Sequence, residues 1–172
     1  VRAGFKDVAF MYEPEAAALS NRAVLGKGDL GLIVDIGGGT SDFTLFRNGA
    51  DTIDILASYG VRLGGTDFDR ALSLETVMPL LGRGSLIRHA FGDDAHVAPA
   101  TIFNDLATWQ KIPFLYAPDS RRLAADLLKY AAEPDKLARL VSVLGDELGH
   151  DVAFAVEAGK IGANAAGAGE ID

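Results

Sequence analysis

The sequence has 172 residues, 49% of them hydrophobic, which is enough for one compact domain or two small subdomains with a buried core. Its 16 basic and 24 acidic residues give a formal net charge of −8, a balance that disfavours a surface for nucleic acid or for anionic membranes. There is no cysteine and no apolar run near the roughly 18 to 20 residues that cross a bilayer, so we expect no disulfide framework, no membrane span and a cytoplasmic location.

The chain begins with a predicted strand that leads into a helix. Residues 8–12 are apolar and stop at Glu13-Pro14, after which the sequence is rich in alanine up to Leu19. Pro14 suits the first helical position because its missing N–H would be unpaired there in any case, and Glu13 then lies at the positive end of the helix. The pattern therefore predicts a carboxylate held at the end of a strand.

Three strands joined by short turns are predicted next. They cover residues 30–36, 43–46 and 52–56. A run of glycines separates the first two strands, and Asn48-Gly49 is a strong signal for a tight hairpin between the second and the third. Consecutive strands with such turns form an antiparallel meander, in which Asp35 and Asp42 would flank the glycine loop.

The rest of the chain is predicted to be mainly helical. The expected helices cover residues 68–81, 100–114, 120–130 and 134 to about 164, and residues 82–99 are expected to form a loop. Thr66 is the candidate N-cap of the first of these helices. Because strands give way to helices at this point, we expect two subdomains, residues 1–66 and 67–172, joined without a flexible linker.

The strongest local signal for chemistry is the glycine loop with its flanking acids, Asp35-Ile36-Gly37-Gly38-Gly39-Thr40-Ser41-Asp42. Consecutive glycines let backbone N–H groups converge on an anion without a Cβ in the way, which is how loops hold phosphate oxygens. Asp35 lies at the end of an apolar strand, where burial of a carboxylate costs free energy unless a cation or a hydrogen-bond donor pairs with it. Hydrated Mg²⁺ would be such a partner. The alternative is a glycine-rich turn with solvated acids. The loop matches neither the Walker nor the Rossmann phosphate motif.

Three motifs occur in an order that resembles the ATPase domain of the heat-shock-70 chaperones. They are residues 13–19, 35–42 and 63–69, with the sequences EPEAAAL, DIGGGTSD and LGGTDFD. The resemblance covers residues 1–72 well and returns weakly at 157–172, and the divergent middle is similar to the bacterial YegD-like branch. It implies an α/β fold: a fragment of the second lobe of an actin-like (ribonuclease H-like) ATPase, with a mixed sheet containing the antiparallel meander and a helical subdomain.

The resemblance also implies a nucleotide site in residues 1–66, the phosphate-binding subdomain of that lobe. Asp35 would bind the hydrated metal and help orient the attacking water, and Glu13 would be a second acid near the metal shell. Asp42 would lie beside an outer-shell site or a monovalent-cation site for K⁺. Thr40 would join Asp35 and Glu13 as the third catalytic residue. The residues expected to line the phosphates or to let the backbone approach the nucleotide are Gly37, Gly38, Gly39, Thr40, Gly64 and Gly65.

A weaker match concerns the nucleoside and lies in the helical subdomain, which would be truncated at its C-terminus. By resemblance, Glu157 and Lys160 would contact the ribose, and Asn164 takes the place of a serine that reaches the adenine. Ile161 replaces an arginine that would stack on the base, which puts base preference in doubt. As a bare pattern, Glu-x-x-Lys is also typical of an exposed ion pair on a helix.

These motifs lead to one main functional expectation and two alternatives. The parent protein would bind ATP or ADP with Mg²⁺ and hydrolyse ATP as a chaperone, working with co-chaperones and unfolded protein clients. The first lobe of the parent is missing here, so the chain is expected to be a trimmed fragment that binds nucleotide weakly and turns it over negligibly. The alternatives are a non-enzymatic chaperone-like regulator and an actin-fold sugar or acyl kinase.

Overall fold

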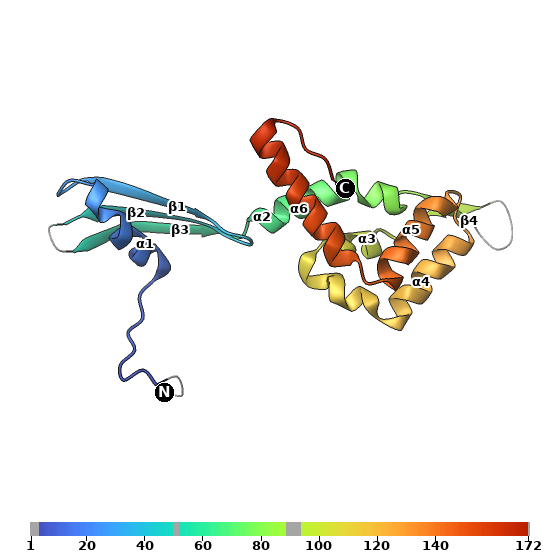
Figure 1. The fold of residues 1–172 in the computed structure, drawn as a ribbon, viewed down its shortest axis with the longest axis horizontal. Coiled ribbons are helices and arrows are strands. Elements are labelled where there is room, and N and C mark those ends of the chain that lie inside the picture. Colours follow the sequence, from blue (N-terminus) through green and yellow to red (C-terminus); the bar gives the residue numbers. More distant parts are fainter. Residues whose placement is uncertain (1–3, 50–51, 89–93, 172) are drawn as a thin grey trace. The chain divides into compact units, whose positions relative to one another are not determined.

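A computed structural model of the chain describes residues 4–49, 52–88 and 94–171. The chain folds as two compact units, Val1–Gly65 and Thr66–Asp172. The first unit is built on a sheet and the second mainly on helices (Figure 1). The expected α/β class is confirmed, but the mixed sheet is not found, because every strand pair of the described residues is antiparallel.

The sheet of the first unit is the predicted meander. Its strands are β1 (Leu30–Ile36), β2 (Ser41–Asn48) and β3 (Ile53–Val61), in the order β1-β2-β3. The last strand is longer than expected because its second half, including Ser58 and Gly60, continues to pair with β2. Across the sheet, Asp35 faces Asp42 and Asp42 faces Gly60. The predicted position of the two acids beside the glycine loop is therefore confirmed.

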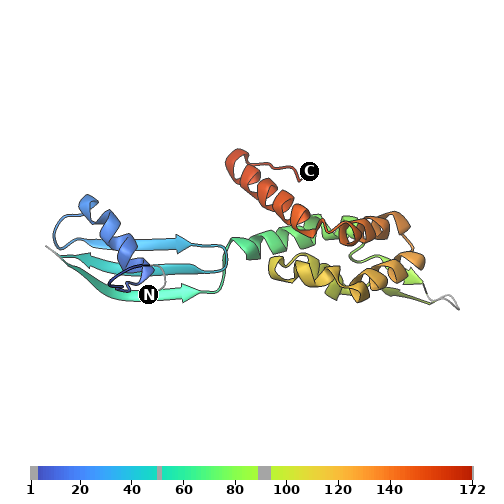
Figure 2. The same cartoon turned by 60° about the horizontal axis from the view of Figure 1, so that its bottom comes forward.

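One face of this sheet is covered by the helix α1 (Glu13–Asn21), as Figures 1 and 2 show. Ala18 of the helix is fully buried, and so are Thr44 and Phe46 of β2. A Cβ on Gly31 would collide with the ring of Phe46, so glycine is needed at this cross-strand pair. A short 3₁₀ helix, Arg22–Val24, follows α1.

The predicted strand over residues 8–12 does not form. These residues lie outside any strand, and the side chain of Phe10 is 96% exposed. A strand needs a partner strand and a surface to pack on, and β-rich composition alone supplies neither. Glu13 is therefore placed by the start of α1 and not by a strand end, and its predicted position at the positive end of the helix is confirmed.

The second unit contains most of the helices. Its elements are α2 (Gly65–Thr76), a 3₁₀ helix (Met78–Leu81), β4 (Leu86–Arg88), β5 (Ala95–Val97), α3 (Ala100–Leu106), a 3₁₀ helix (Trp109–Tyr116), α4 (Pro118–Lys129), α5 (Pro134–Gly145) and α6 (Gly149–Ala166). The largest fully buried side chains of this unit include Met78, Phe103, Leu106, Ile112, Leu137, Leu140 and Leu144. None of the described helices is long and apolar enough to cross a membrane.

Two helix starts and ends differ from the predictions for local reasons. Thr66 is not an N-cap, because α2 already begins at Gly65, whose N–H donates to the carbonyl of Gly37 (3.0 Å). The helix predicted over 100–114 ends at Leu106 and continues as a 3₁₀ segment that contains Pro113, which cannot donate an α-helical hydrogen bond.

The expected loop over 82–99 also holds more structure than its sequence suggested. Within its described part, β4 and β5 form a two-stranded antiparallel sheet, and residues 89–93 lie outside the described residues. An isolated bridge joins Ile87 of β4 to Ala131, just after α4. The side chain of Ile87 is buried in the core of the unit.

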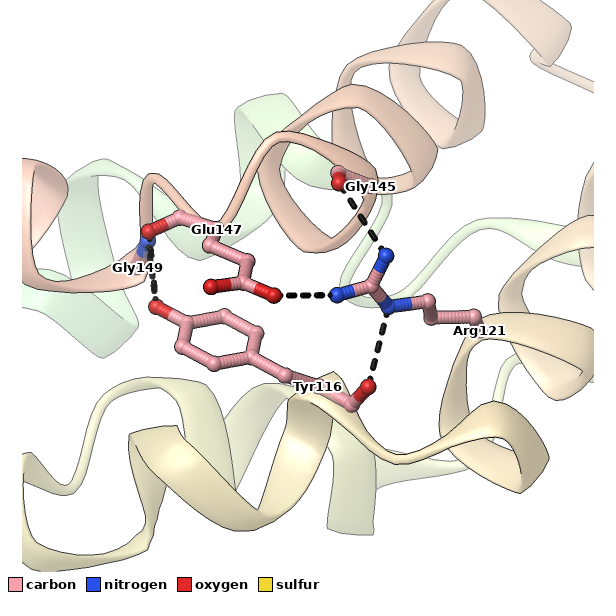
Figure 3. A network of polar contacts seen from close by, with 5 residues as sticks. All are labelled: Tyr116, Arg121, Gly145, Glu147 and Gly149. Carbon is pink, nitrogen blue, oxygen red and sulfur yellow. Dashed lines mark hydrogen bonds and ion pairs between the residues drawn. The ribbon is translucent and has the colours of Figure 1, made fainter.

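The long helix predicted from residue 134 is two helices, α5 and α6, and a polar network lies where the chain breaks between them (Figure 3). Arg121 donates to the carbonyls of Tyr116 (2.9 Å) and Gly145 (3.2 Å) and pairs with the carboxylate of Glu147 (2.6 Å). The hydroxyl of Tyr116 donates to the Glu147 carbonyl (2.9 Å) and accepts from the Gly149 N–H (3.1 Å). The network satisfies backbone groups at the break, where Glu147 takes the left-handed conformation (φ 60°).

Replacing Arg121 by methionine should lower the free energy of unfolding by about 1–2 kcal/mol, because hydrogen bonds from a charged donor stabilise more than neutral ones. Urea unfolding followed by circular dichroism measures the change. Arg122→Met is the matched control, because the ion pair of Arg122 with Asp119 spans 3.7 Å between exposed side chains. The control should change stability by less than about 0.5 kcal/mol. Equal losses would show that the network does not stabilise the break.

Candidate phosphate and metal site

The glycine loop between β1 and β2 is bound to the second glycine motif. Within the loop, the N–H of Gly37 donates to the carbonyl of Thr40 (2.8 Å). Two further hydrogen bonds reach the second motif, from the Ser41 hydroxyl to the Leu63 carbonyl (2.7 Å) and from the Gly65 N–H to the Gly37 carbonyl (3.0 Å). Two motifs that are far apart in the sequence, residues 35–42 and 63–69, therefore form one local structure.

Gly64 allows this contact by having no side chain. A Cβ on Gly64 would lie 2.5 Å from the carbonyl carbon and oxygen of Gly38, which is closer than real Cβ contacts come. Because the obstacle is backbone, no rotamer change could relieve it. We expected Gly64 to let the backbone approach a nucleotide, and the structure gives it a contact with the phosphate loop itself.

Gly38 and Gly39 differ from Gly64, because the fold does not require glycine there. Neither has φ in the left-handed region, and a Cβ built on either would meet no heavy atom within 4 Å. A tight turn needs glycine where φ is positive or where a Cβ at that position would collide with a neighbour, and neither condition holds for Gly38 or Gly39. The alternative of a purely structural glycine turn thus accounts for Gly64 but leaves these two glycines without a reason.

Three acids line one cavity on the face of the sheet that α1 covers. Asp35 and Asp42 are paired across β1 and β2, and Glu13 comes from the first turn of α1. The cavity has a volume of about 210 Å³ and is lined by Glu13, Pro14, Ala17, Ile33, Val34, Asp35, Asp42 and Thr44. Of these lining residues none is basic. Like charges placed directly opposite each other destabilise a sheet, so this arrangement favours a cation.

Carboxylate oxygens are the donors that Mg²⁺ prefers, and Mg²⁺ keeps several of its waters when it binds proteins. Among the described residues, no three acidic or histidine side chains form a group that could hold a metal ion by direct contact, so a cation at the three acids would be bound through its water. The predicted metal set of Glu13, Asp35 and Asp42, with contacts mostly through water, stays a prediction. The donor chemistry of the three acids fits a hydrated cation.

The predicted nucleoside residues lie on α6 in the second unit, where Lys160 already has a partner. Its ammonium lies 2.7 Å from Oδ1 of Asp69 on α2, in an ion pair whose side chains are mostly buried. That oxygen is buried and makes no hydrogen bond within the described residues, so the ion pair is its compensation. Among the described residues, Lys160 therefore forms its ion pair with Asp69 and not with Glu157. The side chains of Glu157 and Asn164 are exposed.

A second cavity, in the helical unit, was not predicted. It measures about 250 Å³ and is lined by Thr66, Asp69, Ser73, Leu106, Ala107, Trp109, Val152, Ala153, Phe154, Val156 and Glu157. The ring of Trp109 packs edge-to-face against His150 and Phe154, with centroids 4.6 and 5.1 Å away. The sequence signal that could have pointed here is Asp69, an acid inside the third motif that lies on α2.

Comparison with known proteins shows which chaperones the chain is similar to. The chain is 29% identical over 170 residues to the chaperone protein DnaK of Thermoplasma acidophilum, a match that covers 92% of this chain and 27% of that protein. The resemblance to the heat-shock-70 chaperones is confirmed. DnaK of Endomicrobium trichonymphae is 42% identical over 73 residues, and the HscA homologue of Shewanella loihica is 38% identical over 71. Each of these two matches covers 41% of this chain and 12% of the relative.

These heat-shock-70 relatives are much longer than the part that is matched. The chain spans about a quarter of the Thermoplasma DnaK, at 27% of its length. No protein-family model matches the sequence. The relatives therefore support a resemblance to chaperones. The role of each site residue has to be argued from the contacts of that residue.

The two kinds of glycine can be separated by alanine substitution. Gly64→Ala should lower the free energy of unfolding by about 1–3 kcal/mol, because the added methyl group overpacks against the Gly38 backbone. Gly38→Ala should change it by less than about 1 kcal/mol and can raise it, because the new methyl group meets open space and restricts the unfolded chain. Urea denaturation of both variants measures the difference. A loss at Gly38 as large as at Gly64 would show that both glycines serve the fold.

Proposed function

We propose that this chain carries the phosphate and metal side of an ATP site in a heat-shock-70-type chaperone. The parent protein would hydrolyse ATP to ADP and phosphate and couple this to protein folding. The observation that carries the proposal is the open space above Gly38 and Gly39, two glycines that the fold does not need, next to the paired acids Asp35 and Asp42. A phosphate chain with its cation supplies a reason for both features at once.

The donors for the phosphates would come from the end of the loop. Gly37 uses its N–H within the loop, whereas among the described residues the amides of Gly39 and Thr40 and the Thr40 hydroxyl make no hydrogen bond. We assign these groups to the β- and γ-phosphates, with Gly37 and Gly38 lining the same surface. Backbone donors fixed before the reaction stabilise charge without reorganising, which is the protein's main contribution to phosphoryl transfer.

The acids would act on the other side of the phosphates. Glu13, Asp35 and Asp42 would hold hydrated Mg²⁺, which when bound offsets the negative charge of the phosphate oxygens. The Asp35 carboxylate would also accept a hydrogen bond from the attacking water and orient it. Asp42, on the neighbouring strand, would serve the outer shell or a K⁺ site. These roles use the acids mainly as hydrogen-bond acceptors, which suits a water-filled cavity.

The nucleoside would contact the helical unit through Glu157, Lys160 and Asn164, with Gly65 near the nucleotide. An ammonium has three N–H donors, so Lys160 can keep its ion pair with Asp69 and still donate to a ribose hydroxyl. Asp69 would then fix the position of the ammonium. Ile161 offers no cation to stack on a base, so we expect weak discrimination among bases.

The partners and the location of the parent protein are proposed from the relatives. The chain matches 27% of the length of the Thermoplasma DnaK, so the activity of the whole protein is itself a proposal. We propose a first lobe of the same parent, co-chaperones and unfolded protein clients as partners, and a cytoplasmic location. A non-enzymatic chaperone-like regulator is the second candidate function, because Lys160 already has an acidic partner and Ile161 stands where the family has arginine.

Calorimetry with Mg-ADP tests the phosphate side on this chain. Weak binding is expected, and Asp35→Asn should reduce the affinity about tenfold, which corresponds to about 1.4 kcal/mol. Asp54→Asn is the matched control, because Asp54 lies on β3 opposite Arg47 and outside the cavity. Binding as tight as that of an intact two-lobe ATPase would contradict the view that half the site is elsewhere. An equal effect of both substitutions would remove Asp35 from the site.

Turnover by the full-length parent tests the catalytic role. Asp35→Asn should lower the rate of ATP hydrolysis by about 10²-fold or more, the usual cost of losing one preorganised group that acts on the transition state. Phosphate release under saturating ATP measures it, with Asp54→Asn again as the control. Equal rates for Asp35→Asn and the unaltered parent would reject the assignment, and no hydrolysis by the unaltered parent would favour the regulator.

A further inference from the structure

The Asp42 carboxylate is placed by a residue that no motif singled out. Asp42 lies on the central strand of the sheet, with Asp35 opposite it on β1 and Gly60 opposite it on β3. Cross-strand partners point to the same face, so all three positions belong to the face that carries the cavity. The cavity lining includes Asp35 and Asp42.

Gly60 provides the room that this carboxylate occupies. A Cβ on Gly60 would lie 2.5 Å from Oδ1 of Asp42 and 3.7 Å from its Cγ. Gly60 has no left-handed φ, so the backbone does not demand glycine. A glycine inside a strand costs stability relative to alanine, and a close approach by another group is a common reason for it. Here the approaching group is the acid itself.

The direction of this lean matters for the two acids. Because β2 lies between β1 and β3, a carboxylate that leans over Gly60 on β3 leans away from Asp35 on β1. A side chain at position 60 would push the Asp42 carboxylate back toward Asp35. The separation of two like charges in the cavity therefore depends on the absence of a side chain on the third strand.

We propose that Gly60 is a positioning residue that sets the spacing of the Asp35 and Asp42 carboxylates and thereby makes the site selective for a strongly hydrated divalent cation. This inference rests on the proposed function. Selectivity between Mg²⁺ and Ca²⁺ depends on cavity size and on how many oxygens bind the ion directly. Carboxylates held apart suit an ion that keeps its water, and carboxylates pushed together suit an ion that sheds it.

A stability cycle tests the contact without any ligand. Gly60→Ala should lower the midpoint of urea unfolding in the unaltered chain, because the methyl group displaces the Asp42 carboxylate toward Asp35. In the Asp42→Ala background the same substitution should raise the midpoint, because the obstacle is gone and alanine suits a strand better than glycine. A drop of equal size in both backgrounds would overturn the inference, since Gly60 would then act independently of Asp42.

A metal titration tests the selectivity. Mn²⁺ alone is the probe, followed by electron paramagnetic resonance, and Mg²⁺ and Ca²⁺ are added as competitors. Gly60→Ala should weaken the competition by Mg²⁺ about tenfold and the competition by Ca²⁺ by less. Tenfold is the lower end of the affinity loss seen when a residue that orients a metal ligand is changed. In the Asp42→Ala background it should have no further effect. Gly162→Ala is the control, because Gly162 lies on α6 of the second unit and a Cβ there would meet no heavy atom within 4 Å.

The outcomes separate this inference from the proposed function. Mn²⁺ binding that Asp35→Asn removes supports the metal site whatever Gly60 does. If Mn²⁺ binds in this way, two results would overturn the role of Gly60 and leave the metal site standing. One is that Gly60→Ala does not change the selectivity between Mg²⁺ and Ca²⁺. The other is that Gly60→Ala weakens Mg²⁺ competition as much in the Asp42→Ala background as in the unaltered chain. Absence of Mn²⁺ binding by the unaltered chain overturns the metal site and the selectivity role together.

Discussion

The register between β1 and β2 is the constraint on which the candidate site depends. It pairs Asp35 with Asp42 at the end of the two strands that the glycine loop connects. Because side chains alternate between faces, a slip of one residue would send either acid to the opposite face and separate it from α1. Gly31 of β1 is paired with Phe46 of β2, and a Cβ on Gly31 would collide with the Phe46 ring, so this register needs glycine at position 31.

Glycine serves three different purposes around the site. Gly64 lets the backbone approach that of Gly38, and Gly60 leaves room for the carboxylate of Asp42. Gly38 and Gly39 do neither, and a Cβ on either of them would meet open space. The sequence presents all of these as one class of residue. They differ in what lies where a Cβ would be: backbone at Gly64, a carboxylate at Gly60 and open space at Gly38 and Gly39.

Local patterns predicted the parts of the fold that depend on local physics. The meander followed from apolar runs separated by glycine and by Asn48-Gly49, and the start of α1 followed from Pro14. Failures came from partners distant in sequence: residues 8–12 had no strand to join, and the break after α5 is stabilised by Arg121, 26 residues from Glu147. The ion pair of Lys160 with Asp69 and the close approach of Asp42 to Gly60 also join residues that are distant in sequence, so local patterns could not predict them.

The outward face of β1 has a consequence for the colloidal behaviour of the chain. Leu32, Val34 and Ile36 alternate along this edge strand and are 62%, 49% and 64% exposed. An edge strand with apolar side chains is a template for pairing between molecules, and the opposing force is repulsion from a net charge of −8. Salt screens that repulsion, with a Debye length of about 10 Å at 0.1 M. Solubility should therefore be greatest at low ionic strength and at a pH well above the isoelectric point of about 4.8.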